Sequence, residues 1–269
     1  MKKIIFFDLD GTLLTTDKKI LEENKEAIKR AKDAGIEVAL CSGRQLNSVK
    51  VYKDMADTGK YIICANGAEI IDVEKNDVLS VIEISEEITE YLCDLVKREN
   101  AVIRIDTRYA RYISDIGYAI LEEIGFEGLN KNIIDENVLQ ISIGATDESK
   151  IDRIIEEVRK IPGIKIENKF YLDVYKDREG IWIINVINVA ASKGNAINGL
   201  CRYLKIGLEE AVCFGDDLND ISMFNTVGYP IAMGNAHEVI KGKAKEIIGH
   251  NDEPSIAKKI DEIIEENRK

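Results

Sequence analysis

The feature that most constrains this sequence is a repeated order in which a short apolar run precedes a segment expected to form a helix. Residues 3–7, 36–41 and 61–64 are mainly apolar runs without polar alternation, the pattern of strands buried on both faces. Segment 22–34 carries apolar residues at helical spacing, and segment 45–57 is expected to be a second helix. Such strand–helix–strand units with short connections predict a parallel sheet with helices on both faces.

The order of elements changes in the middle of the chain. Segments 69–73 and 78–83 flank a turn-prone stretch and predict a hairpin. The elements expected after it are helix 86–99, strand 102–106, helix 116–124, strand 139–144, helix 148–160, and strands 164–167, 170–175 and 182–189. Three strands in succession indicate an antiparallel edge, and therefore a separate α+β unit.

The first order resumes after residue 192, with further strands predicted at 211–215 and 229–233. The predicted fold class is therefore α/β, with a Rossmann-like parallel-sheet core formed by residues 1–83 and 190–269. An α+β domain, residues 84–189, is expected to be inserted into this core.

Composition excludes several kinds of partner. The 269 residues include 37 Lys and Arg against 49 Asp and Glu, a net charge of −12 that repels nucleic acid and anionic membranes. The first apolar run ends at Asp8, too early for a signal peptide, and five scattered cysteines form no Cys-x-x-Cys pair. A cytoplasmic protein is predicted, with no obligatory protein partner evident.

Polar residues gather where predicted strands end or a helix begins. They form four clusters: Asp8, Asp10, Gly11 and Thr12; Ser42, Gly43 and Arg44; Lys193; and Asp216, Asp217, Asn219 and Asp220. Ligands of an open parallel sheet bind beyond the carboxyl ends of its strands. Converging carboxylates repel one another unless a cation lies between them, and hard oxygen ligands suit Mg²⁺. A hydroxyl, a glycine turn and a lysine suit a phosphate, so the combination predicts phosphoryl-transfer chemistry.

These clusters resemble the four motifs of the haloacid dehalogenase-like hydrolases, in the same order. Asp8-Leu9-Asp10-Gly11-Thr12 is similar to the first motif, and the second to fourth are matched by Ser42-Gly43-Arg44, Ser192-Lys193-Gly194 and Gly215 to Asp220. Asn66-Gly67-Ala68 and Met233 to Ala236 further resemble the Cof-type subfamily. That subfamily carries a large cap domain between its second and third motifs, the interval in which the insertion is predicted here.

The resemblance implies a role for each matching residue. Asp8 would attack phosphorus and form an aspartyl-phosphate, while Asp10 would protonate the leaving group and then deprotonate water. Mg²⁺ would be held by the carboxylates of Asp8 and Asp216 and by the backbone carbonyl of Asp10. The phosphate would be held by Ser42, the amide of Gly43, Lys193 and Asn219, and Asp220 would orient the water molecules on the metal. Asp217 is assigned only to the periphery of the metal.

Each motif taken alone also has a purely structural interpretation. Asp8 to Gly11 is compatible with a strand and a turn, Ser42-Gly43 with a helix N-terminus, and Lys193 with a solvated lysine. Residues 216–220 are compatible with a capped helix start, although they lack the spacing of an EF-hand calcium loop. Asn66-Gly67 is either a simple turn or a contact to substrate. The presence of four motifs in order favours the catalytic interpretation.

The predicted function is a Mg²⁺-dependent phosphatase acting on a small-molecule phosphate ester, such as a sugar phosphate or a related monoester. A phosphomutase of the same fold and a non-catalytic phospho-ligand-binding or regulatory protein are the alternatives. Substrate choice is expected to lie in the cap, where one polar cluster contains Arg104, Asp106, Arg108, Tyr109, Arg111 and Tyr112. This cluster is compatible with recognition of a sugar or carboxylate, but it is more typical of a solvated hairpin or surface loop.

Overall fold

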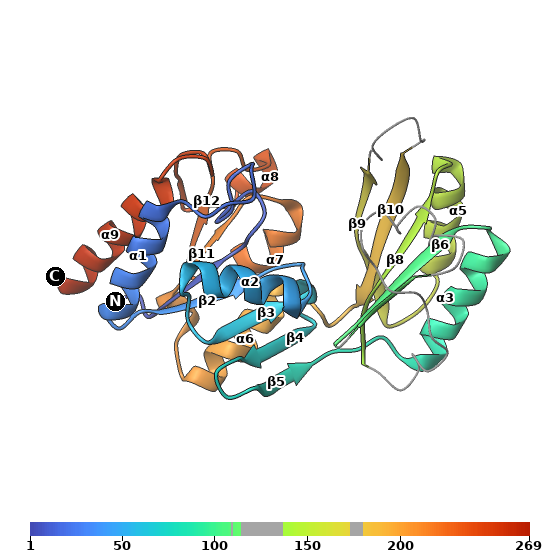
Figure 1. Ribbon diagram of the computed structural model, residues 1–269, viewed down its shortest axis with the longest axis horizontal. Helices are drawn as coiled ribbons and strands as arrows, with labels where there is room; N and C mark the ends of the chain where they lie inside the picture. Colours follow the sequence, from blue (N-terminus) through green and yellow to red (C-terminus); the bar gives the residue numbers. More distant parts are fainter. Residues whose placement is uncertain (109, 114–136, 173–179) are drawn as a thin grey trace. The chain divides into compact units, whose positions relative to one another are not determined.

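The computed structural model describes residues 1–108, 110–113, 137–172 and 180–269. These residues form two compact units, which are described separately (Figure 1). The first unit combines Met1–Ser80 with Ala191–Lys269, and the second comprises Val81–Ala190. Within the described part of the chain, no helix combines the length and apolar character needed to cross a membrane.

An eight-stranded sheet forms the centre of the first unit. Its spatial order is β13 (Glu246–Ile247), β12 (Tyr229–Ala232), β11 (Ala211–Gly215), β1 (Ile4–Phe7), β2 (Glu37–Cys41), β3 (Tyr61–Cys64), β4 (Glu69–Asp72) and β5 (Asp77–Val81). The strands from β13 to β3 pair in parallel, and β4 pairs antiparallel with β3. The parallel sheet predicted from the apolar runs is therefore confirmed.

Helices cover both faces of this sheet because successive side chains of each buried strand point in opposite directions. Ile5 and Phe7 share one apolar cluster with residues of three helices: α1 (Glu22–Asp33), α2 (Leu46–Ala56) and α9 (Ser255–Arg268). Ile4 and Phe6 share the opposite cluster with residues of α6 (Lys193–Leu204), α7 (Ile221–Phe224) and α8 (Glu238–Lys241). In Figure 1, α1 and α9 lie side by side on the first of these faces.

The second unit contains a five-stranded sheet whose described strands all pair antiparallel. Its order is β7 (Arg111–Ile113), β6 (Val102–Thr107), β8 (Val138–Ala145), β10 (Ile181–Asn188) and β9 (Ile164–Leu172). Helices α3 (Glu86–Arg98) and α5 (Glu148–Val158) begin at the side-chain caps Ser85 and Asp147. Their apolar residues pack on one face of the sheet in a single core, which gives the expected α+β character.

One predicted break in this sheet is wrong. Strands 164–167 and 170–175 were expected to be separate, yet β9 runs without interruption from Ile164 to Leu172. Because β9 lies at the edge of the sheet, its polar residues reach water while the backbone stays paired with β10, whose register shifts at Asn185/Val186. The predicted helix 116–124 and residues 173–175 lie outside the described residues.

Candidate active site

The site is built where three neighbouring parallel strands end. Strand β1 lies between β2 and β11, with Phe7 opposite Leu40 on one side and Phe214 on the other. Asp8 directly follows β1 and donates its backbone N–H to the carbonyl of Phe214 at 3.1 Å. Asp216 directly follows β11, so strand order brings together two aspartates that are 208 positions apart in the chain.

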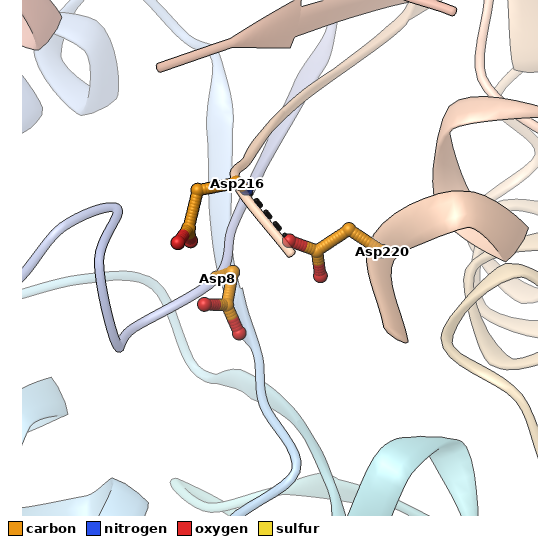
Figure 2. A group of neighbouring side chains, drawn as sticks. All are labelled: Asp8, Asp216 and Asp220. Atoms are coloured by element: carbon orange, nitrogen blue, oxygen red, sulfur yellow. Dashed lines mark hydrogen bonds between the residues drawn. The ribbon is translucent and has the colours of Figure 1, made fainter. Parts of the chain in front are cut away.

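Three carboxylates meet at these strand ends. Oxygen atoms of Asp8, Asp216 and Asp220 lie within 4.8 Å of one another, as the convergence of the side chains in Figure 2 illustrates. Asp8 and Asp220 are buried, and Asp216 is partly exposed. This is the acidic cluster that could hold a metal ion among the residues that the structure describes.

A buried lysine joins two of these carboxylates. Lys193 is the first residue of α6. The residue before it, Ser192, caps the helix, because its hydroxyl accepts a hydrogen bond from the N–H of Asn195. The Lys193 Nζ donates to Oδ1 of Asp8 and to Oδ1 of Asp220, each at 2.6 Å. The lysine is 0% exposed, so the interpretation as a solvated lysine is wrong.

The electrostatics of the cluster favour an additional cation. Burial, together with the neighbouring carboxylates Asp220 and Asp216, raises the pKa of Asp8 to about 8 against the opposing effect of Lys193. Burial likewise raises the pKa of Asp216 to about 7. Three carboxylates balanced by one lysine leave excess negative charge among oxygen donors, the kind of donor set that a hard divalent cation prefers. The residues present therefore fit a magnesium ion.

Small residues and backbone amides hold the acidic loops in place. The Thr12 hydroxyl donates to Oδ1 of Asp216 at 2.7 Å. Gly11 has φ +76°, and a Cβ at this position would lie 2.2 Å from Oδ2 of Asp216. Oδ2 of Asp220 accepts hydrogen bonds from the N–H of Asp216 at 2.8 Å and of Asp217 at 3.2 Å. Asp220 thus supports both Lys193 and the Asp216 loop, whereas the Asp217 side chain is exposed.

Asp10 belongs to a different cluster of charges. Arg44 donates from Nε and Nη2 to the two oxygens of Asp10 at 2.6 and 2.7 Å, and Lys18 Nζ donates at 2.7 Å. The guanidinium of Arg44 also lies 5.0 Å from the centre of the Tyr52 ring and contacts Ser48. Partial burial raises the pKa of Asp10, but the hydrogen bonds from Arg44 and Lys18 outweigh this effect and lower the pKa to about 2.

The predicted phosphate-binding residues surround a loop after β3. Ser42 directly follows β2 and is buried, and Gly43 is next to it. Asn219 donates from Nδ2 to Oδ1 of Asn66 at 3.2 Å, and a Cβ on Gly43 would lie 2.8 Å from the same Asn66 oxygen. The structure therefore brings Gly43 and Asn219 to one side chain, Asn66.

Sequence reasoning gave no role to several residues that shape the site. Lys18 and Arg44 are the cations paired with Asp10, and only Arg44 lay inside a recognised motif. Asn235, inside the segment 233–236, donates from Nδ2 to the carbonyl of Gly11 at 2.8 Å. No local pattern marks Lys18, whereas Asn235 was already within a segment that resembles the Cof-type subfamily.

The polar cluster expected in the second unit is partly packed. Arg104 and Arg111 contact opposite oxygens of Asp106 at 3.0 and 2.7 Å, and Asp106 is 1% exposed. Arg104 also donates to the hydroxyl of Ser142 at 2.9 Å. The cluster lies on the antiparallel pair β6–β7, where Asp106 is buried between two partly exposed arginines, so this hairpin is packed in part and solvated in part. Tyr109 lies outside the described residues. Recognition of substrate by this cluster stays a prediction.

A parallel sheet that gathers carboxylates and a buried lysine at its strand ends defines an α/β enzyme. A family model described as haloacid dehalogenase-like hydrolase matches residues 5–260, and the chain belongs to this family. The chain is 30% identical over 286 residues to the Bacillus subtilis 5-amino-6-(5-phospho-D-ribitylamino)uracil phosphatase YwtE, covering 97% of this chain and 98% of that protein.

Other relatives agree with this assignment. The Escherichia coli pyridoxal phosphate phosphatase YbhA is 26% identical, with 95% of this chain and 96% of that protein covered. The solved structure of a haloacid dehalogenase-like hydrolase from B. subtilis superposes with a TM-score of 0.80 at 25% identity, covering 96% of this chain and 99% of that one. The family and fold class predicted from the motifs are confirmed, and the chain is a hydrolase of this family.

Proposed function

We propose that the protein is a Mg²⁺-dependent phosphatase that hydrolyses small phosphorylated metabolites through an aspartyl-phosphate. The observation that carries the proposal is the Asp8 carboxylate, which is buried beside Asp216 and held at 2.6 Å by Lys193. The carboxylates of Asp8 and Asp216 and the backbone carbonyl of Asp10 would hold a Mg²⁺ ion, which would supply positive charge to offset part of the negative charge of a phosphate. Lys193 contributes a second, permanent positive charge.

Asp8 is the nucleophile in this mechanism. Lys193 holds Oδ1, so we assign Oδ2 as the atom that bonds to phosphorus while the bond from phosphorus to the ester oxygen breaks. A water molecule then attacks the phosphorus of the aspartyl-phosphate, the bond to Oδ2 breaks, and phosphate leaves. Ser42, the N–H of Gly43 and Asn219 are assigned to the phosphate oxygens, and Lys193 faces the charge that develops in both steps.

Asp10 is assigned as the acid and base. It gives a proton to the departing ester oxygen and takes one from the attacking water. Arg44 and Lys18 stabilise the charged form of Asp10, which is the base, and they oppose the protonation that the acid role requires. Weakening either contact would therefore favour proton transfer from Asp10 to the leaving group.

The substrate class rests on the site and on the relatives together. Core residues address only the phosphate, and the named relatives act on esters as different as pyridoxal phosphate and a ribitylaminouracil phosphate. We therefore assign the choice of leaving group to residues 84–189 as a cap domain, and catalysis to residues 1–83 and 190–269. A small phosphate monoester, including sugar phosphates, is the proposed substrate.

The test measures phosphate release from p-nitrophenyl phosphate and from a panel of metabolite monoesters, with Mg²⁺ and with EDTA. The wild type is expected to turn over with Mg²⁺ only, and Asp8→Asn to lose activity by more than about a thousandfold because the nucleophile is gone. Asp33→Asn, an exposed aspartate on α1, is the matched control and should match the wild type. Undiminished turnover by Asp8→Asn would refute the mechanism, and isomerised product without free phosphate would indicate a mutase.

A further inference from the structure

A strained loop lies beside the proposed phosphate site and has no role in the function described so far. Ala65, Asn66 and Gly67 follow β3 with φ values of 48°, 55° and 93°. The left-handed region is sterically unfavourable for residues with a Cβ, and two of these three carry one. Strained backbone of this kind persists where the surrounding structure enforces it, and it clusters at functional sites.

Backbone contacts hold the loop against two of the motifs. The N–H of Ala65 donates to the carbonyl of Arg44 at 2.9 Å, and the N–H of Asn66 donates to the carbonyl of Ser42 at 3.1 Å. A Cβ on Gly67 would lie 2.2 Å from the carbonyl oxygen of Ser192, so this glycine allows the loop to approach the start of α6 closely. The loop therefore touches the segments that carry Ser42 and Lys193.

The Asn66 side chain adds a contact to a third motif. It is 3% exposed, its Oδ1 accepts the hydrogen bond from Nδ2 of Asn219, and it fills the space in front of Gly43. Glycine would adopt the same backbone conformation with less strain. Asparagine also tolerates this conformation, but its amide adds contacts with Asn219 and Gly43 that a glycine would lack.

We propose that Asn66 is a positioning residue for phosphate binding, a proposal that rests on the proposed function. Its Oδ1 fixes one N–H of the Asn219 amide and thereby directs the other toward a phosphate oxygen. Its side chain also keeps the backbone of Gly43 in place, so that the N–H of Gly43 faces the same phosphate. Asn66 thus acts through Gly43 and Asn219, not as a catalytic residue.

The test compares two Asn→Gly variants at left-handed positions. Asn66→Gly removes the amide but suits the backbone, whereas Asn76→Gly makes the same change at φ 52° in the exposed turn between β4 and β5. We expect kcat/KM for p-nitrophenyl phosphate to fall at least tenfold in Asn66→Gly, mainly through a higher KM, and to be unchanged in Asn76→Gly. Asn66→Gly also removes a buried hydrogen bond, so both variants are assayed well below their melting temperatures, where each is fully folded.

A double-mutant cycle separates positioning from a general structural role. If Asn66 acts partly through Asn219, the variant Asn66→Gly/Asn219→Ala will lose less activity than the sum of the two single losses, because only the effect on Gly43 remains. Fully additive losses of activity would overturn the proposal. Wild-type turnover with an unaffected Asn66→Gly would overturn it too, while leaving the phosphatase function intact.

Binding of inorganic phosphate tests the role of Asn66 even if the protein hydrolyses none of the esters. With Mg²⁺ present, phosphate should raise the melting temperature of the wild type and of Asn76→Gly clearly more than that of Asn66→Gly. Equal shifts in all three proteins, or no shift in any of them, would contradict a positioning role for Asn66. If the wild type binds phosphate but hydrolyses none of the esters, the result counts against the proposed function and not against the role of Asn66.

Discussion

Replacing Lys193 with methionine removes the only positive charge that contacts the acidic cluster among the described residues. Methionine is apolar and similar in length, so the main change is electrostatic. Lys193 and the Asp220 side chain are 0% exposed and the Asp8 side chain is 8% exposed, so water cannot replace the lost charge. Removing one partner from a buried ion pair costs about 3–5 kcal/mol. We expect the free energy of unfolding of Lys193→Met to fall by about this amount at pH 8 without metal.

The loss should depend on pH in a defined direction. Burial raises the folded-state pKa of Asp8 to about 8 and that of Asp216 to about 7, against an ordinary value of 3.8. The folded state therefore binds more protons than the unfolded state over this range, and stability falls as pH rises from about 4 to about 8. Lys193→Met removes a charge that opposes these shifts. The free energy of unfolding that this variant loses relative to the wild type should therefore be smaller at pH 5, where Asp8 and Asp216 are protonated and no longer repel each other.

Urea unfolding at pH 5 and pH 8, with and without Mg²⁺, measures these effects. A Mg²⁺ concentration about 100 times the dissociation constant adds about 2.7 kcal/mol, so the ion should restore much of the loss. Lys259→Met is the matched control, because Lys259 is 6% exposed and pairs with Glu246 and Glu262 at 2.7 and 2.9 Å. The side chains of Glu246 and Glu262 are 32% and 58% exposed, so water partly replaces the lost ion pairs. We expect the free energy of unfolding of Lys259→Met to fall by about 1 kcal/mol, and Mg²⁺ to change it no more than it changes that of the wild type. If Lys193→Met and Lys259→Met lose equal free energies of unfolding at pH 8, the buried charge balance around Lys193 is not what stabilises the site.

Two further predictions concern residues beside the nucleophile. Gly11→Ala, whose Cβ would lie 2.2 Å from Oδ2 of Asp216, should displace this carboxylate and raise the Mg²⁺ concentration for half-maximal activity by about tenfold, which corresponds to about 1.4 kcal/mol. Gly35→Ala has a similar φ and open space around it, so an equal shift there would disprove a local cause. Asp10→Asn should slow alkyl phosphates far more than p-nitrophenyl phosphate, because only poor leaving groups need a proton. Asp10 also activates water in the second step, so the first step is measured on its own: equal slowing of ester cleavage in single-turnover assays of both substrates would argue against the acid role.

The sheet and the acidic cluster could be predicted from the sequence because both follow from short patterns. A buried parallel strand is a short apolar run, and its end is marked by the first polar residues, as at Asp8, Ser42 and Asp216. Once β1 lies between β2 and β11, those residues meet without any further information. The break expected near residue 168 failed because an edge strand tolerates the polar composition that ends a central one.

The partners of individual side chains could not be predicted in the same way. Lys18 and Arg44 meet at Asp10 through the course of two loops, after β1 and before α2, and neither loop has a repeating pattern. The Asn-Gly pair favours a turn with positive φ, as observed at Asn66, but it does not reveal that the Asn66 side chain contacts Gly43 and Asn219. Sequence therefore indicates which residues gather, whereas packing decides which atoms bond.

The formal charges around the strand ends show why the cation and the substrate must act together. Four carboxylates, those of Asp8, Asp10, Asp216 and Asp220, face three cations, those of Lys18, Arg44 and Lys193. When all are ionised the sum is −1, in a chain whose net charge of −12 already repels anions. One divalent cation changes the local sum to +1, within a Debye length of about 8 Å. Binding of a phosphate ester should therefore be coupled to binding of the metal, because only the metal-bound site attracts an anion.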